Sequence, residues 1–165
     1  METERLEIRL YKESEKENIV GLLTDEAVMK FVDTGIFSRE KAEKLWTKLY
    51  QSFYPNGITT IYGVFEKSDG RYLGHAAIRP RPLQPDEWEI SYILKTEEWG
   101  KGYATEIARK LIEFGFSELN LKAVYATVDT NNFASIRILG KIGMKHIRDE
   151  YDEQGKFYLY GIKQY

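Results

Sequence analysis

Residues 87–119 read EWEISYILKTEEWGKGYATEIARKLIEFGFSEL and place a strand, a glycine-rich turn and a helix in immediate succession. Residues 87–94 alternate and are rich in aromatic and β-branched side chains, which predicts a β-strand. Apolar residues return every three or four positions across 103–119, which predicts an amphipathic helix. Gly100 and Gly102 precede this helix. Because a helix start carries N–H groups without partners in the helix, the turn is a candidate anion site.

Two nucleotide-binding motifs contain similar glycines, and neither fits this turn. The dinucleotide fingerprint requires a third glycine where Thr105 stands. The P-loop requires four residues between its glycines and a Lys-Ser or Lys-Thr pair after the second, and GKGYAT (100–105) has neither. A tight turn without a ligand therefore remains an alternative on the glycines alone.

Length and composition restrict the classes of protein that this chain can belong to. At 165 residues we expect one domain over 1–165, and 42% hydrophobic with 30% charged residues is a globular composition. The net charge of −2 argues against broad nucleic-acid binding. The charged start METERLEIRL does not resemble a signal peptide and no apolar run has membrane-spanning length, so we expect a cytoplasmic protein without a membrane partner. The chain has no Cys, which excludes a cysteine nucleophile and a thiolate metal site, and we expect no metal.

The remaining segments predict an α+β (mixed α/β) fold and not a doubly wound sheet. Helical spacing predicts helices at 14–26, 38–53 and 131–143, and Ser38 is a candidate N-cap. Alternation predicts strands at 5–10, 59–66, 71–79 and 123–128 and a final hairpin within 145–164. Asp69-Gly70 predicts a hairpin turn. Segment 80–87 contains three prolines, so we expect a loop there.

A second segment, TVDTNNFASIRILGKIGMK (127–145), gives the glycine turn its context. Together with WGKGYATE (99–106) and EISYIL (89–94), its NFAS and GKIGM steps resemble the GNAT superfamily of acyl-CoA-dependent N-acetyltransferases. The subgroup that it resembles in particular contains the ribosomal-protein N-terminal acetyltransferases, for which the opening TERLEIR is also typical. The resemblance spans nearly the whole chain. It implies a central, twisted, mostly antiparallel sheet that splays in the middle, with helices on both faces.

The resemblance also implies where acetyl-CoA, the expected co-substrate, is bound. The pantetheine arm is expected to pair with the backbone around Tyr92, Ile93 and Leu94, where a backbone N–H would polarise the thioester carbonyl. Asn132 and Ser135 are expected beside the arm. The amides of the glycine turn are expected to hold the pyrophosphate. They belong to Gly100, Lys101, Gly102, Tyr103, Ala104 and Thr105.

Two positions depart from the family pattern. Glu97 stands where many members have Gln or Arg, and a carboxylate there is not expected to help bind a pyrophosphate. Leu139 stands where many members have a Tyr that protonates the leaving thiolate, and Leu cannot do so. In the ribosomal-type subgroup a serine takes that role, and Ser135 occupies its position. Solvation or capping of the helix after Asn132 is the alternative role for Ser135.

An amine is protonated at neutral pH, so a transfer to it needs a proton acceptor. Glu89 is one candidate because alternation puts it on one face of the central strand. Glu150 is another, since the ribosomal-type subgroup often has a glutamate before the final hairpin turn. A solvated strand charge is the alternative for each. His75, in an apolar strand, is expected to be structural.

The sequence therefore predicts direct transfer of an acetyl group from acetyl-CoA to a primary amine, on a protein N-terminus or on a small molecule. The amine site is expected between the first two helices, segment 80–87 and the last hairpin, where Asp33, Asp86 and Asp152 could attract a cation. The main alternative is a catalytically weak protein that binds acyl-CoA as a sensor. Transfer of a longer acyl chain is a second alternative. Edge strands at both ends of the sheet could pair between two copies, which would make a homodimer.

Overall fold

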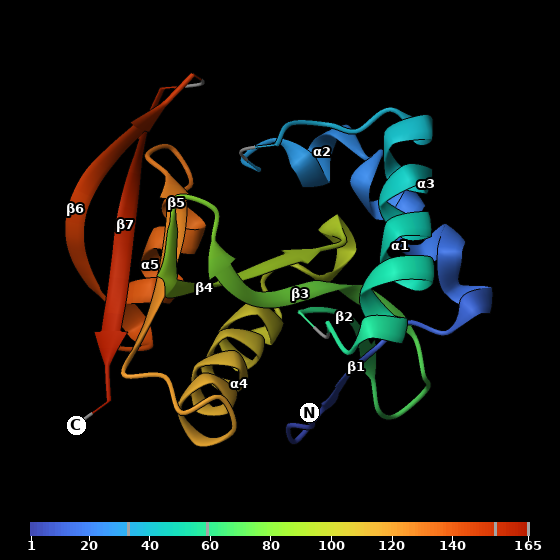
Figure 1. Ribbon diagram of the computed structural model, residues 1–165, viewed down its shortest axis with the longest axis horizontal. Helices are drawn as coiled ribbons and strands as arrows, with labels where there is room; N and C mark the ends of the chain where they lie inside the picture. Colours follow the sequence, from blue (N-terminus) through green and yellow to red (C-terminus); the bar gives the residue numbers. More distant parts are fainter. Residues whose placement is uncertain (33, 59, 154, 165) are drawn as a thin grey trace.

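Seven strands form one sheet in the computed structural model, which describes residues 1–32, 34–58, 60–153 and 155–164 (Figure 1). Expectations that touch Asp33, Thr59 or Gln154 lie outside the described residues at those positions. The order across the sheet is β1-β2-β3-β4-β5-β7-β6, and all neighbours are antiparallel except β4 and β5. This confirms the predicted mixed, mostly antiparallel sheet. The strands are β1 (Leu6–Arg9), β2 (Ile61–Glu66), β3 (Tyr72–Arg81), β4 (Gln84–Leu94), β5 (Ala123–Asp129), β6 (Lys145–Asp152) and β7 (Gly155–Lys163).

Helices cover both faces of the sheet, as the fold class requires (Figure 1). On one face α1, α2 and α3 form a core cluster that includes Val20 and Phe65. On the other face α4 and α5 contribute to a second cluster, in which Ile107 packs with Ile90 of β4. Within the described residues, every helix is too short or too polar to span a bilayer. The helices are α1 (Lys16–Leu23), α2 (Glu26–Met29), α3 (Arg39–Lys48), α4 (Tyr103–Ser117) and α5 (Phe133–Lys141), with short turns η1 (Glu13–Glu15), η2 (Leu49–Phe53), η3 (Tyr54–Asn56) and η4 (Thr96–Glu98).

The two parallel strands separate soon after they meet. β4 and β5 pair at Glu89 and Tyr125, and beyond that position the described strands run on to Leu94 and Asp129 without further pairing between them. On its other side, β4 remains paired with β3 as far as Leu94. Backbone groups on the β5 side of β4 are therefore left for another partner, because a strand that ends its pairing leaves N–H and C=O groups unsatisfied. This gap is the predicted splay in the middle of the sheet.

The prediction of a loop at 80–87 is wrong. β3 continues to Arg81 and β4 begins at Gln84, so these residues form the end of a hairpin with a bulge between Pro80 and Arg81. Proline is tolerated because each strand has only one neighbour here: β2 pairs with β3 only as far as Ala77, and β5 meets β4 only at Glu89. A residue without an N–H then removes no ladder hydrogen bond on the open side.

Capping side chains fix where the first helices begin. The Ser38 hydroxyl accepts a hydrogen bond from Lys41 N at 3.2 Å, which confirms the predicted start of α3. The helix predicted over 14–26 is wrong at its C-terminal end, because the helix stops at Leu23. Asp25 then caps a new helix, α2, by accepting from Ala27 N at 2.9 Å.

Candidate functional site

The glycine turn between β4 and α4 lets a ligand approach the backbone closely. Gly100 and Gly102 have left-handed φ angles of +76° and +84°, which side chains with a Cβ adopt only with strain. Gly102 is the N-cap of α4, so the N–H groups of the first helical turn have no partner inside the helix. A Cβ added at Gly100 would meet no atom within 4 Å, so the backbone there faces open space. This arrangement fits the diphosphate of coenzyme A.

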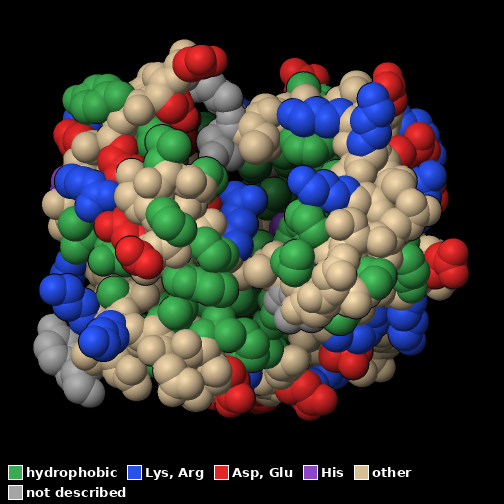
Figure 2. All heavy atoms as spheres, viewed as in Figure 1, with side chains coloured by type: hydrophobic (Ala, Val, Ile, Leu, Met, Phe, Trp, Pro, Cys, Tyr) green, Lys and Arg blue, Asp and Glu red, His purple; other side chains and the backbone are tan. Residues whose placement is uncertain are grey.

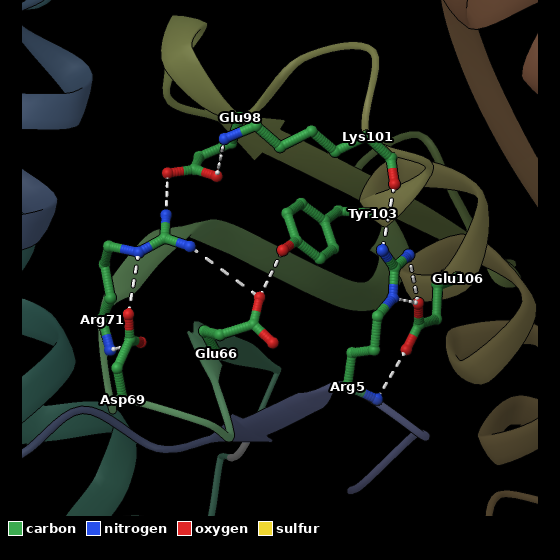
Figure 3. Close-up of polar contacts among 8 residues, drawn as sticks. All are labelled: Arg5, Glu66, Asp69, Arg71, Glu98, Lys101, Tyr103 and Glu106. Atoms are coloured by element: carbon green, nitrogen blue, oxygen red, sulfur yellow. Dashed lines mark hydrogen bonds and ion pairs between the residues drawn. The ribbon is translucent and has the colours of Figure 1, made fainter.

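Charged side chains from the residue before β1, the β2–β3 hairpin and η4 surround the turn (Figure 3). The Lys101 ammonium lies 3.1 Å from Glu98, and the other oxygen of the Glu98 carboxylate accepts from Arg71. The Lys101 carbonyl accepts from Nη1 of Arg5 at 3.1 Å. Lys101, predicted to contact the cofactor, is therefore already held by two protein partners, although 48% of its side chain stays exposed.

A cavity of about 430 Å³ lies beside the first turns of α4. Gly102 and Thr105 line it together with charged residues of both signs, none of which the sequence analysis identified: the cations are Arg5, Arg109, Lys110 and Lys141, and the acids are Glu2, Glu4, Glu106 and Glu113. The described residues provide no ion-pair partner for Arg109 or Lys141. For Arg109 a signal was present, because it lies four residues after Thr105 and so on the same helix face. Lys141 comes from the end of α5, and only the fold brings it here.

Tyr92 and Ser135 meet where β4 faces α5. Their hydroxyl groups lie 3.0 Å apart, and burial raises the pKa of Tyr92, so that the phenol stays protonated. The Asn132 side chain accepts from the backbone N–H of Ser135 at 3.1 Å and caps α5. This cap fixes the carbonyl oxygen of the Asn132 amide, while its NH₂ group remains a donor. The hydroxyl of Ser135 is thus used by Tyr92 and not by the helix backbone.

The backbone of β4 alternates between its two neighbours. The Ile93 carbonyl oxygen lies against β3, since a Cβ added at Gly74 would be 2.1 Å from it. Successive backbone groups of a strand point to opposite sides, so those of Tyr92 and Leu94 point towards β5 and the gap. The Leu94 carbonyl accepts from the Trp99 indole N–H at 2.9 Å. Of the three residues predicted to meet the pantetheine arm, Tyr92 therefore offers the most complete set of backbone groups.

Leu139 is a core residue of the face that carries α4 and α5. Its side chain is 1% exposed and packs in the cluster that contains Ile90 and Leu111. The side chain at this position is therefore buried in the core and carries no hydroxyl group that could donate a proton. Ser135, one turn earlier, is the residue of α5 that carries a hydroxyl group.

The two predicted proton acceptors belong to one cluster around Arg81. Arg81 is 6% exposed; its guanidinium lies 3.7 Å from Glu89 and hydrogen bonds Glu150. Glu89 also lies 3.2 Å from Arg79, and Glu150 lies 2.6 Å from Arg148. Sequence reasoning missed this cluster because it assigned Arg81 to a loop. The two glutamates therefore share Arg81 as a cationic neighbour.

His75 lies in the core under α1 and α3. Burial, with a smaller contribution from the charge of Arg79, lowers the pKa of His75 to about 4, so the ring is neutral at neutral pH. Its Nδ1 is 3.5 Å from the Tyr11 hydroxyl, which in turn is 3.0 Å from that of Tyr72. The ring is stacked on Tyr11. These contacts fit the structural role expected for His75.

The face of the sheet opposite α4 is hollowed. Figure 2 shows the hollow between the β6–β7 hairpin on the left and the α2–α3 region on the right, with Lys or Arg side chains inside it. Of the acidic residues expected near the amine, Asp86 and Asp152 are exposed, and Asp33 lies outside the described residues. The described part of the chain contains no group of three or more His, Asp and Glu side chains able to hold a metal.

Comparison with known proteins agrees with the geometry of the turn and the gap. Residues 5–145 match the family described as the acetyltransferase (GNAT) domain. The uncharacterized N-acetyltransferase YnaD of Bacillus subtilis is 28% identical over 143 residues, covering 87% of this chain and 81% of YnaD.

Solved structures show the same fold. An acetyltransferase of the GNAT family from Bacillus anthracis superposes with a TM-score of 0.84 and 24% identity over 99% of this chain and 97% of its own. A spermidine N-acetyltransferase from Vibrio cholerae in complex with CoA and spermine has a TM-score of 0.79 and 16% identity over 98% and 97%. Ribosomal-protein acetyltransferases also occur among the similar folds. The chain therefore belongs to the GNAT family of acetyltransferases, enzymes that use acetyl-CoA.

Proposed function

We propose that the protein transfers an acetyl group from acetyl-CoA directly to a primary amine, with both substrates bound at once. The carrying observation is that one continuous segment, β4–η4–α4, carries both the gap, which opens after Glu89, and the open glycine turn that precedes α4. An elongated cofactor can then contact helix amides at one end and strand backbone at the other. The amine would enter from the opposite, hollowed face (Figure 2).

The turn and its surroundings would hold coenzyme A through charge and backbone donors. The amides of Gly100 to Thr105 would bind the diphosphate, as helix N-termini do. Arg109 and Lys141 line the adjacent cavity and would add positive charge for the phosphate groups. The backbone of Tyr92 would pair with the pantetheine arm, and the Asn132 amide NH₂ would donate to it. When bound, acetyl-CoA supplies the activated thioester that an amine can attack.

Ser135 would donate the proton that the departing thiol needs. The Tyr92 hydroxyl can donate to Ser135 Oγ, which leaves the serine hydrogen free to point into the gap. A hydrogen bond received by Ser135 Oγ also stabilises negative charge that develops there during donation. The buried Leu139 offers no competing donor.

Glu89 or Glu150 would take the proton of the ammonium group, directly or through a water molecule. Both carboxylates are largely buried, with 10% and 16% of their side chains exposed, and both contact Arg81. Glu89 stands where β4 and β5 separate, which is the position on β4 nearest to the opening of the gap. A sensor that binds acyl-CoA without turnover is the second candidate function, because arginine side chains already occupy both candidate bases.

Calorimetric titration with acetyl-CoA, run beside a screen of amines for release of free thiol, tests the proposal. Binding together with amine-dependent thiol release is expected. If acetyl-CoA binds but no thiol is released in the presence of protein N-terminal peptides, polyamines or small amines, the sensor is favoured. No binding would overturn the assignment of the turn.

A further inference from the structure

The structure assigns a positioning role to Arg5, which holds the glycine turn in the conformation that accepts a diphosphate. This inference rests on the proposed binding of coenzyme A at the turn. Arg5 lies just before β1, far in sequence from the turn, and Figure 3 shows its guanidinium between Lys101 and Glu106.

Arg5 joins the turn to the helix that follows it. Its Nη1 donates to the Lys101 carbonyl at 3.1 Å, while Nε and Nη2 donate to Oε2 of Glu106 at 2.8 and 2.6 Å. The backbone N–H of Arg5 donates to the second carboxylate oxygen of Glu106 at 3.1 Å, and the Thr3 hydroxyl binds the same oxygen. The guanidinium also lies over the Tyr103 ring, 4.4 Å from its centroid. Each of the three guanidinium nitrogens thus donates one hydrogen bond to the turn or to the first turns of α4.

The contact with Lys101 decides the orientation of a peptide in the turn. The Lys101 C=O and the Gly102 N–H belong to one planar trans peptide and therefore point in opposite directions. Because Arg5 holds the oxygen, the Gly102 N–H is directed away from Arg5. The left-handed glycines would otherwise allow this peptide to rotate, since glycine has little preference between positive and negative φ.

Lys101 is also held from its other end. Its ammonium pairs with Glu98, which is 3% exposed and is bound by Arg71 from the β2–β3 hairpin (Figure 3). Arg5 thus holds the carbonyl of Lys101, and Glu98, itself bound by Arg71, holds the side chain. The turn is therefore fixed at Lys101 from both sides.

Arg5 also removes an electrostatic conflict. Glu106 lies in the first turns of α4, where its carboxylate alone would repel a diphosphate at the helix start. Burial disfavours the ionised form, but the hydrogen bonds from Thr3 and Arg5 outweigh it and lower the pKa of Glu106. The ion pair therefore carries no net charge to the cofactor, and Glu106 serves as the anchor of Arg5.

A comparison of two acetyl donors distinguishes a role of Arg5 in diphosphate binding from a role in folding alone. Acetyl-CoA carries the diphosphate, and S-acetylpantetheine lacks it. For Arg5→Lys and Arg5→Gln we expect the KM for acetyl-CoA and the Kd for CoA to rise about tenfold, the typical effect of losing one charge-assisted hydrogen bond. The kcat/KM for S-acetylpantetheine should stay within about twofold of the wild type, because the missing contacts serve only the diphosphate. Thr3→Val should weaken CoA binding less than either change at Arg5.

Arg39→Lys is the matched control, because Arg39 makes ion pairs with Glu17 and Glu43 far from the turn. It should change neither donor's kinetics. Equal losses with both donors in the Arg5 variants would overturn the inference and reduce Arg5 to a folding role, and unchanged CoA affinity would overturn it outright. Failure of the proposed function looks different: the wild type itself would bind no CoA, or would release no thiol from acetyl-CoA with any amine.

Discussion

The Tyr92 hydroxyl on β4 lies 3.0 Å from Ser135 Oγ on α5, across the region where β4 and β5 separate. The two groups are 43 residues apart in sequence, and each comes from a different wall of the gap. The Ser135 hydroxyl therefore has the Tyr92 phenol as its hydrogen-bond partner. If Ser135 protonates the departing thiolate, the Tyr92 phenol supports the serine in its role as general acid.

Tyr92→Phe should lower kcat about tenfold, the usual effect of one lost hydrogen bond, with little change in the Kd for CoA. Ser135→Ala should lower kcat further, because it removes the donor itself. In the double variant the loss should equal that of Ser135→Ala alone, since Tyr92 acts through Ser135. Steady-state kinetics with saturating amine measures all three, and independent, additive losses would show that the hydrogen bond has no role in proton donation.

Gly102→Glu should raise the Kd for CoA at least about tenfold, because a side chain and a negative charge are added where the diphosphate is expected. Gly57→Glu is the control for backbone strain: Gly57 also has a left-handed φ, +72°, but it lies in the turn after η3, whereas a Cβ at Gly102 would lie 3.5 Å from Nη2 of Arg5. Both variants carry the same backbone strain. Calorimetry should therefore show weakened binding for the first alone, and equal effects would mean that strain and not the ligand explains the loss.

Loss of the base should be visible in the pH profile. The variant that lacks the true base, Glu89→Gln or Glu150→Gln, should be slow at neutral pH and recover as pH rises, because more of the amine is then already deprotonated. Glu87→Gln is the control, since Glu87 contacts the same Arg81 and Arg148 without being a candidate base. A wild-type profile in both test variants would remove both candidates.

His75 should make the fold sensitive to acid. Its pKa is about 4 in the folded protein and about 6.5 in an unfolded chain, so the unfolded state binds the proton first as pH falls. Stability is therefore lost between pH 6.5 and 4, by up to roughly 3 kcal/mol at about 1.4 kcal/mol per pKa unit. Urea unfolding at pH 7 and pH 4.5 should show a smaller loss in His75→Gln than in the wild type.

His146→Gln supplies the control for this experiment. His146 is an exposed histidine that lies 2.9 Å from Asp149. Because it is not buried, its replacement should leave the loss of stability close to that of the wild type. A His75→Gln variant with the wild-type pH dependence would show that His75 is not neutral in the fold.

Local sequence patterns predicted the strand, the turn and the helix whose backbone forms the proposed coenzyme A site. The alternation of 87–94, Gly100 and Gly102, and the periodicity of 103–119 each depend on neighbours in sequence, and the structure has a strand, a turn and a helix there. The prolines of 80–87 led to the wrong prediction of a loop. Their effect depends on whether a strand has neighbours on both sides, and this is a property of the whole sheet.

Contacts between side chains could not be predicted in the same way. Arg5 and Glu106 are 101 residues apart, and Arg81 and Glu150 are 69 apart. From the local sequence alone, each of these residues would be predicted to be an exposed surface charge. Only the order of the strands brings them together, and this is why the candidate bases appeared independent in sequence but share one arginine in the fold.

The central claim is direct transfer from acetyl-CoA to an amine while both are bound. The most direct test is an initial-rate study in which acetyl-CoA and the best amine of the screen are both varied, with the acetylated amine identified by mass spectrometry. The account predicts intersecting lines in double-reciprocal plots, because both substrates must bind before any product leaves. Parallel lines, which indicate an acetylated enzyme intermediate, or thiol release without acetylated amine, would contradict it.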